Sequence, residues 1–233
     1  MYQETKALSN TFMANVFSWM FAAMGLTALA AYLFGTSEEL FSFIYGINEK
    51  GVMSMTMFGW LVTLSPFIIV LGMSFSGSKL SAKTTILLYL LYSILMGMSL
   101  SSIFYVYTSA SIVKTFVITA GMFGIMAIMG YTTKTDLTKL GSILLMALFG
   151  MIIAMLVNFF THSARLEYII SVAGVIVFTG LTAYDVQKIK NIGQLGIDEN
   201  DTMMKITIFA ALSLYLDFLN LFLYLLRFFG RRD

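Results

Sequence analysis

The amino-acid sequence predicts an all-α membrane protein with seven transmembrane helices. Hydrophobic residues make up 59% of the 233 residues, charged residues only 11%, and the mean hydropathy is +0.87. Soluble domains carry about 25% charged residues. Seven apolar segments are each close to or above the ~20 residues that cross a hydrocarbon core as a helix. Strands of a membrane barrel would be shorter and would alternate in polarity.

The seven apolar segments leave no room for a soluble domain, so we expect a single integral membrane domain over residues 1–233. In chain order the segments cover about 14–34, 52–73, 84–107, 112–131, 140–160, 167–190 and 203–229. The longest connections, 35–51 and 191–202, are polar and contain glycine.

Individual residues in these segments support the assignment. The first segment lacks the basic start and small-residue cleavage site of a signal peptide, so we expect it to be a retained helix. The one proline, Pro66, predicts a kink in the second segment. Gly121, Gly124 and Gly130 in the fourth favour close packing against another helix. The sixth and seventh segments differ from the others because each contains an aspartate.

The distribution of lysine and arginine predicts a cytoplasmic N-terminus, because positive residues concentrate on the cytoplasmic side of a membrane. The side that holds the N-terminus collects Lys6, Lys79, Lys83, Lys134, Lys139, Lys188, Lys190 and Lys205. The opposite side collects Lys50, Lys114, Arg165, Arg227, Arg231 and Arg232. Seven spans place the arginine-rich tail outside, whereas a re-entrant last segment would return it to the cytoplasm.

The composition also argues against several kinds of partner. The formal net charge of +2 is too small to indicate nucleic acid. The chain has no cysteine and one histidine, His162, so we expect neither thiol chemistry nor a zinc or haem site, and no cofactor.

Asp185 and Asp217 lie on consecutive apolar segments. An ionised carboxylate at bilayer depth costs at least ~3 kcal/mol, so such a group normally faces a partner or a water-filled cavity. Residues three or four apart share a helix face, and Thr182 shares the face of Asp185. The seventh segment carries a polar stripe formed by Ser213, Asp217, Asn220, Tyr224 and, at its edge, Arg227. Lipid is a poor environment for this stripe, so we expect the seventh helix to be central, with the other six packed around it.

If the two aspartates meet, both cannot ionise cheaply, and the pair titrates as a unit that can hold a single proton. Loss of that proton would drive the two helices apart, which makes a pH switch. Deprotonated, the pair offers hard oxygen ligands to a cation such as calcium, to which Thr182, Ser213 and Asn220 could add oxygens. The alternative is that each aspartate only bonds a neighbouring helix.

The segments TGLTAYDVQKIK and ALSLYLDFLNLFLYLLRFFG resemble the Bax inhibitor-1 family of small seven-helix membrane proteins, in particular its bacterial branch. The resemblance implies six helices around the last one and a pH-sensitive calcium leak in a bacterial inner membrane. The family's paired aspartates correspond to Asp185 and Asp217. Glu49 and Arg227 match positions where the family can form an ion pair, which could be a latch that closes the outer mouth; the alternative is that both are solvated interface charges. In some members a basic residue on the second helix approaches the aspartates, but this chain has no charged residue from Gly51 to Gly77.

Three other functions compete with a channel for calcium or another cation. One is a regulatory scaffold that binds other membrane proteins, such as a membrane protease or cell-death proteins. Another is an intramembrane aspartyl protease, an enzyme class whose Tyr-Asp motif Tyr184 and Asp185 imitate. That class uses Gly-x-Gly-Asp on the seventh helix, where this chain has Leu214, Tyr215 and Leu216, so we expect no enzyme. A secondary transporter would show internal repeats with broken helices, which the sequence does not show.

Overall fold

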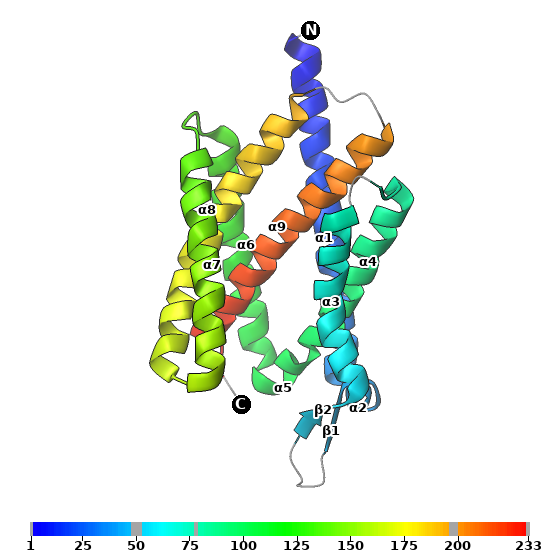
Figure 1. Ribbon diagram of the computed structural model, residues 1–233, viewed down its shortest axis with the longest axis vertical. Helices are drawn as coiled ribbons and strands as arrows, with labels where there is room; N and C mark the ends of the chain where they lie inside the picture. The colour runs from blue at the N-terminus through cyan, green and yellow to red at the C-terminus, as the bar shows by residue number, and fades with distance from the viewer. Residues whose placement is uncertain (1, 48–52, 77–78, 196–199, 232–233) are drawn as a thin grey trace. The chain divides into compact units, whose positions relative to one another are not determined.

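The computed structural model describes residues 2–47, 53–76, 79–195 and 200–231, and these residues are almost entirely helical (Figure 1). In chain order they form α1 (Tyr2–Thr36), α2 (Glu38–Ile44), β1 (Tyr45–Ile47), β2 (Met53–Met55), α3 (Met57–Ser76), α4 (Ala82–Ser99), the 3₁₀ turn η1 (Leu100–Ser102), α5 (Ile103–Val106), α6 (Ser109–Thr132), α7 (Thr138–Thr161), α8 (Ala164–Gly193) and α9 (Asn200–Phe229).

The prediction of an all-α protein with seven spanning helices is confirmed. Within the described residues, seven helical stretches are long and apolar enough to cross a membrane. They cover 9–36, 57–76, 82–106, 109–132, 138–161, 164–193 and 201–229. Most run a few residues beyond the predicted segments, because polar end residues continue a helix that hydropathy alone would stop. The last span is the most buried of the seven, as expected of a helix at the centre of a bundle.

The connection predicted at 35–51 contains the short helix α2 and the first strand of an antiparallel pair, β1 with β2. The second spanning helix consequently begins at Met57 and not near residue 52. The backbone N–H of Thr56 donates to the Ile44 carbonyl at 2.9 Å, and its side-chain oxygen accepts from the Gly59 N–H at 2.9 Å. Thr56 therefore ends the strand pairing and caps the helix.

The chain divides into two compact units. Unit 1 comprises Met1–Met13, Ser109–Gly196 and Ser213–Arg231, and unit 2 comprises Ala14–Thr108, Ile197–Leu212 and Arg232–Asp233. Helices α1 and α9 contribute residues to both units.

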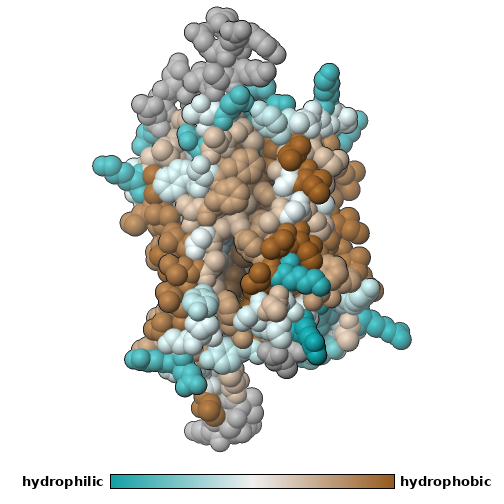
Figure 2. Space-filling view, turned by 180° about the vertical axis from the view of Figure 1, so that it is seen from behind, coloured by the Kyte–Doolittle hydropathy of each residue, from teal (hydrophilic) through white to brown (hydrophobic). Residues whose placement is uncertain are grey.

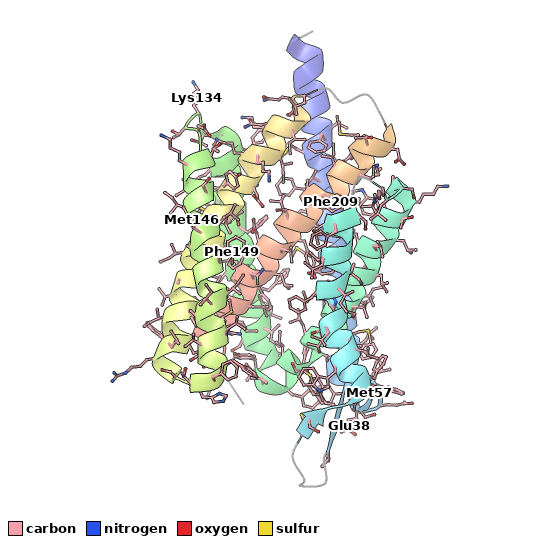
Figure 3. All side chains as sticks on the ribbon, viewed as in Figure 1. Glu38, Met57, Lys134, Met146, Phe149 and Phe209 are labelled. Carbon is pink, nitrogen blue, oxygen red and sulfur yellow. The ribbon has the colours of Figure 1, made fainter. Side chains whose placement is uncertain are left out.

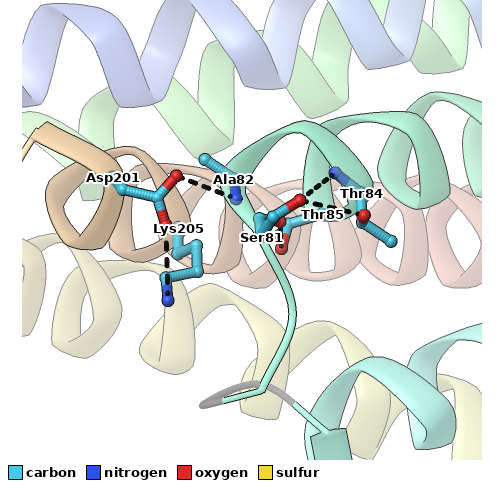
Figure 4. Close-up of polar contacts among 6 residues, drawn as sticks. All are labelled: Ser81, Ala82, Thr84, Thr85, Asp201 and Lys205. Carbon is cyan, nitrogen blue, oxygen red and sulfur yellow. Dashed lines mark hydrogen bonds and ion pairs between the residues drawn. The ribbon is translucent and has the colours of Figure 1, made fainter.

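In unit 2, α1 packs closely on α4. The Thr27 hydroxyl donates to the Ser93 carbonyl at 2.8 Å, and a Cβ at Gly97 would meet the backbone of Thr27. The first turn of α9 is tied to the start of α4 (Figure 4). There the Asp201 carboxylate accepts from the Ala82 N–H at 3.2 Å and pairs with Lys205 at 3.6 Å.

In unit 1, α8 packs against both α6 and α7. Glycines allow these approaches, since a Cβ at Gly130 of α6 would meet the Ala183 backbone and one at Gly141 of α7 would lie 2.5 Å from the Tyr184 ring. We call the end of unit 1 that holds the turn between α6 and α7 the α6–α7 end. There Tyr131 donates its hydroxyl to Asn10 at 2.7 Å, and the Lys190 ammonium donates to the Tyr131 carbonyl at 2.8 Å.

The opposite end of unit 1, the α7–α8 end, holds the turn at His162. There the Arg231 N–H donates to the Ser111 hydroxyl at 2.9 Å. Between the two ends the helices present apolar side chains outward, as Met146 and Phe149 of α7 show (Figure 3). Figure 2 shows hydrophobic side chains along the lengths of the helices, with hydrophilic side chains gathered towards their ends. This surface fits a lipid environment.

We expect Gly130→Ala to lower stability by about 1–3 kcal/mol, because the added methyl group would push against the backbone of α8. Gly124→Ala on the same helix is the matched control. No atom lies within 4 Å of a Cβ there, and alanine favours a helix by up to ~1 kcal/mol over glycine. Thermal unfolding of both variants in one detergent measures the difference. Equal midpoints would show that this approach of α6 to α8 does not limit stability.

Candidate functional site

Three consecutive residues of α8 face three different helices of unit 1. The Ala183 backbone packs on Gly130 of α6, and the Tyr184 ring packs on Gly141 of α7. The Asp185 carboxylate accepts a short hydrogen bond from the Ser213 hydroxyl of α9. Successive helical residues point about 100° apart, so contacts with α6 and α7 on two sides direct Asp185 towards α9.

Asp217 lies one helical turn beyond Ser213 on α9 and is 5% exposed. Its Oδ2 atom is buried and has no hydrogen-bond partner among the described residues. Asp185 bonds to Ser213, one helical turn from Asp217, so the two carboxyl groups lie near each other on facing helices. The structure therefore places both acids at one α8–α9 contact, where Asp185 bonds to Ser213 and Asp217 keeps a free oxygen.

A second contact defines the register of the two helices. A Cβ at Gly174 of α8 would lie 2.5 Å from the Tyr224 ring of α9. The contacts of Asp185 with Ser213 and of Gly174 with Tyr224 are eleven residues apart on both helices (174 to 185 and 213 to 224). The helices therefore run antiparallel in a constant register, which puts Asp217 about 6 Å along the axis from Ser213, towards Tyr224.

The polar residues predicted to support the acids lie on α8 and α9, and two of the four bond within their own helix. Thr182 is fully buried, and its hydroxyl donates to the Phe178 carbonyl at 2.8 Å. Asn220 donates its amide to the Leu216 carbonyl at 2.8 Å. Both side chains keep oxygen lone pairs as acceptors. The Tyr224 hydroxyl instead approaches the Met155 sulfur of α7 at 3.6 Å.

The predicted outer ion pair joins Glu49 to Arg227. Glu49 lies outside the described residues, so the pair stays a prediction. Arg227 is exposed, and its guanidinium carbon lies 5.7 Å from the centre of the Tyr224 ring.

Sequence reasoning missed the role of Gln187, two residues after Asp185. Its side-chain oxygen accepts from the Leu137 N–H at 2.8 Å, and its amide donates to the Thr135 carbonyl at 2.8 Å. Gln187 thus holds the turn between α6 and α7 against α8. The motif YDVQ contains this residue, but an amide near a helix end does not by itself indicate which turn it binds.

The oxygen atoms at the acid site come from two carboxyl groups, with hydroxyl and amide oxygens of Thr182, Ser213 and Asn220 on the same two helices. Among the described residues no group of three or more His, Cys, Asp or Glu side chains could hold a metal ion.

The fold and the site define the class of this protein, an integral membrane protein of seven helices with two acids at the contact of the last two. The chain belongs to the Bax inhibitor-1 family, because the family model described as "Inhibitor of apoptosis-promoting Bax1" matches residues 9–233. The family assignment made from the sequence motifs is thereby confirmed.

Bacterial relatives match nearly the whole chain. "Inner membrane protein YbhL" of Escherichia coli (strain K12) is 46% identical over 237 residues, which cover 98% of this chain and 95% of the relative. An uncharacterized protein of Borreliella burgdorferi is 46% identical over 225 residues, covering 97% of this chain and 94% of the relative. An uncharacterized membrane protein of Streptococcus pyogenes serotype M1 is 34% identical over 242 residues, covering 100% of this chain and 97% of the relative.

The register of α8 and α9 predicts which cysteine pairs form a disulfide in a chain that has no cysteine of its own. Oxidation should crosslink the double variant Asp185→Cys/Ser213→Cys. Asp185→Cys/Asn220→Cys should stay reduced, because position 220 lies about 10 Å further along the axis and a disulfide needs Cα atoms within about 7 Å. Titration of free thiols after oxidation measures both. Equal crosslinking would show that the helices slide past each other.

Proposed function

We propose that this protein conducts calcium or a related cation across the membrane, along a path controlled by protonation of Asp185 and Asp217. One observation carries the proposal. Asp217 holds a buried oxygen without a hydrogen-bond partner among the described residues, near a second acid on the neighbouring helix. Ionisable groups at membrane depth commonly mark ion pathways or proton relays.

Repulsion between the two acids supplies the switch. With one proton on the pair, a single negative charge remains, and Asp185 keeps its bond to Ser213. Loss of that proton leaves two carboxylates within electrostatic reach in a poorly solvated place. Their repulsion favours separation of α8 from α9 at this level, and the same oxygens then become ligands for a cation. Conduction should therefore increase as the pH rises through the titration of the pair.

Other titratable groups of unit 1 need controls. Lys188 acts electrostatically on Asp185 from the same helix. In the α6–α7 turn, Thr138 donates its hydroxyl at 2.6 Å and its N–H at 2.9 Å to the Asp136 carboxylate, and these bonds hold the pKa of that carboxyl below its usual value. Asp136 therefore stays ionised between about pH 5 and pH 8 and cannot be the switch. His162 is the one histidine in this chain and needs a control as well.

Liposomes that contain the protein and a calcium dye test the proposal between about pH 5 and pH 8. We expect the flux of the natural protein to rise by up to about tenfold per pH unit below the titration of the pair and then to level off, as for a switch that releases a single proton. Asp185→Asn and Asp217→Asn should give a low flux with no pH dependence, because an amide neither ionises nor repels the other acid.

Asp136→Asn and His162→Gln are the matched controls, and both should keep the pH profile of the natural protein. If all five proteins give the same flux at every pH, the acids are not the switch. Calcium flux no greater than in empty liposomes would remove the channel itself.

We place the protein in a bacterial inner membrane, with the lipid bilayer as its constant partner. A relative 46% identical is named an inner membrane protein. The cytoplasmic side for the N-terminus follows from the positive charge of the α6–α7 end, where Lys134, Lys139 and Lys188 lie with Asn10 of α1.

A second, non-enzymatic function is favoured by the description of the family model, which names an inhibitor of apoptosis-promoting Bax1. It suggests a regulatory scaffold that binds other membrane proteins. Affinity capture from membranes separates this function from conduction. A scaffold should retain the same partners in Asp185→Asn and Asp217→Asn, whereas a partner that only follows ion flux should be lost from both.

A further inference from the structure

The polar face of α9 continues past the acids and then stops at an aromatic ring. Ser213, Asp217, Asn220 and Tyr224 share this face. Tyr224 follows Asp217 by seven residues, or about 10 Å along the axis towards the α7–α8 end. Any water or ion that moved along this face from the acids to that end would meet the Tyr224 ring.

Two helices of unit 1, α8 and α7, hold the ring in place. On α8 it fills the space above Gly174, where a Cβ would lie 2.5 Å from the ring carbon Cδ2, and it stacks on Phe178 with ring centres 5.8 Å apart. On α7 the hydroxyl approaches the Met155 sulfur at 3.6 Å. Tyr224 is 6% exposed.

The surroundings of the Tyr224 ring are apolar, whereas those of the acids are polar. Methionine sulfur is a weak acceptor, and a phenylalanine ring and a glycine offer no side-chain hydrogen bond. Water has little to bind at this level, and hydrophobic constrictions close a path by excluding water. The Arg227 guanidinium, 5.7 Å from the ring centre, adds a positive charge on the side away from the acids, which opposes the approach of a cation from there.

We propose that the Tyr224 ring is a second barrier on the polar face of α9, separate from the aspartate pair, that closes the path between the acids and the α7–α8 end. The assignment of an ion to this path rests on the proposed function, whereas the barrier to water does not. The ring closes the path whatever the protonation of the acids, so both barriers must open for conduction.

Cysteine reactivity tests the barrier without any ion flux, because the chain has no cysteine. A single cysteine, Asn220→Cys, lies between Asp217 and the ring, and Ser213→Cys lies level with Asp185, on the other side of Asp217. Each is combined with Tyr224, Tyr224→Ala or Tyr224→Phe in the full chain in nanodiscs and treated with a charged maleimide. Access from the α6–α7 end is the same in all, because the members of each series differ only at position 224.

We expect Tyr224→Ala to raise the labelling rate at position 220 about tenfold or more, since the dry constriction is removed. Tyr224→Phe should not change it, because the ring remains. The rate at position 213 should stay low in all three, since Asp217 still separates it from the opened side. Gly174→Ala, which displaces the ring without shortening it, should raise the rate at 220 as well.

An unchanged rate at 220 in both Tyr224→Ala and Gly174→Ala overturns the barrier. A parallel rise at 213 and 220 also overturns it, because it reports general loosening of the helices. Calcium flux measured on the same proteins distinguishes the two proposals. A selective rise at 220 with no effect of Asp185→Asn or Asp217→Asn on flux retains the barrier and rejects the acid switch.

Discussion

The close approach of α8 to its neighbours is the constraint on which the site depends. Glycines at 130, 141 and 174 leave no side chain between α8 and the facing helix, so Ala183, Tyr184 and the Tyr224 ring occupy that space. In a membrane the lipid tails are as apolar as the helices, and association relies on such close packing. Three approaches from different directions determine the rotation of α8 about its axis, and with it the direction of Asp185.

This rotation makes two membrane-embedded acids tolerable. A carboxylate that faced lipid would cost at least ~3 kcal/mol, whereas Asp185 bonds to Ser213 and Asp217 is covered on all sides. The remaining Asp217 oxygen has no partner in the described part of the chain. A buried polar atom without a partner destabilises a fold, and sites where a protein keeps one are commonly sites of function.

Two polar neighbours of the acids make their structural hydrogen bonds without the acids. Thr182 and Asn220 satisfy their donors on carbonyl groups of their own helices, so neither needs the acids for its stability. Their oxygens keep lone pairs that can still accept a hydrogen bond.

Much of the fold follows from the sequence, because hydropathy and length are local properties of each segment. Seven spans, their approximate limits, the polar stripe of the last helix and the isolation of Asp185 and Asp217 were all predictable. The start of α3 was not, because the β1–β2 pairing and the Thr56 cap depend on contacts with α2 and β1. The hydrogen bonds of Gln187 to the α6–α7 turn were not predictable either, because its partners Leu137 and Thr135 lie about fifty residues earlier in the chain.

The sequence by itself determined that this chain is an integral membrane protein and that its two membrane-embedded acids must face away from lipid. Only the tertiary structure decided that Asp185 bonds to Ser213, that Asp217 keeps a free oxygen, and that Tyr224 closes over Gly174. The physical reason is that packing decides the rotation of each helix about its own axis and its register against its neighbours. A shift of one residue turns a helical side chain by about 100°, and only packing between helices selects one of those directions.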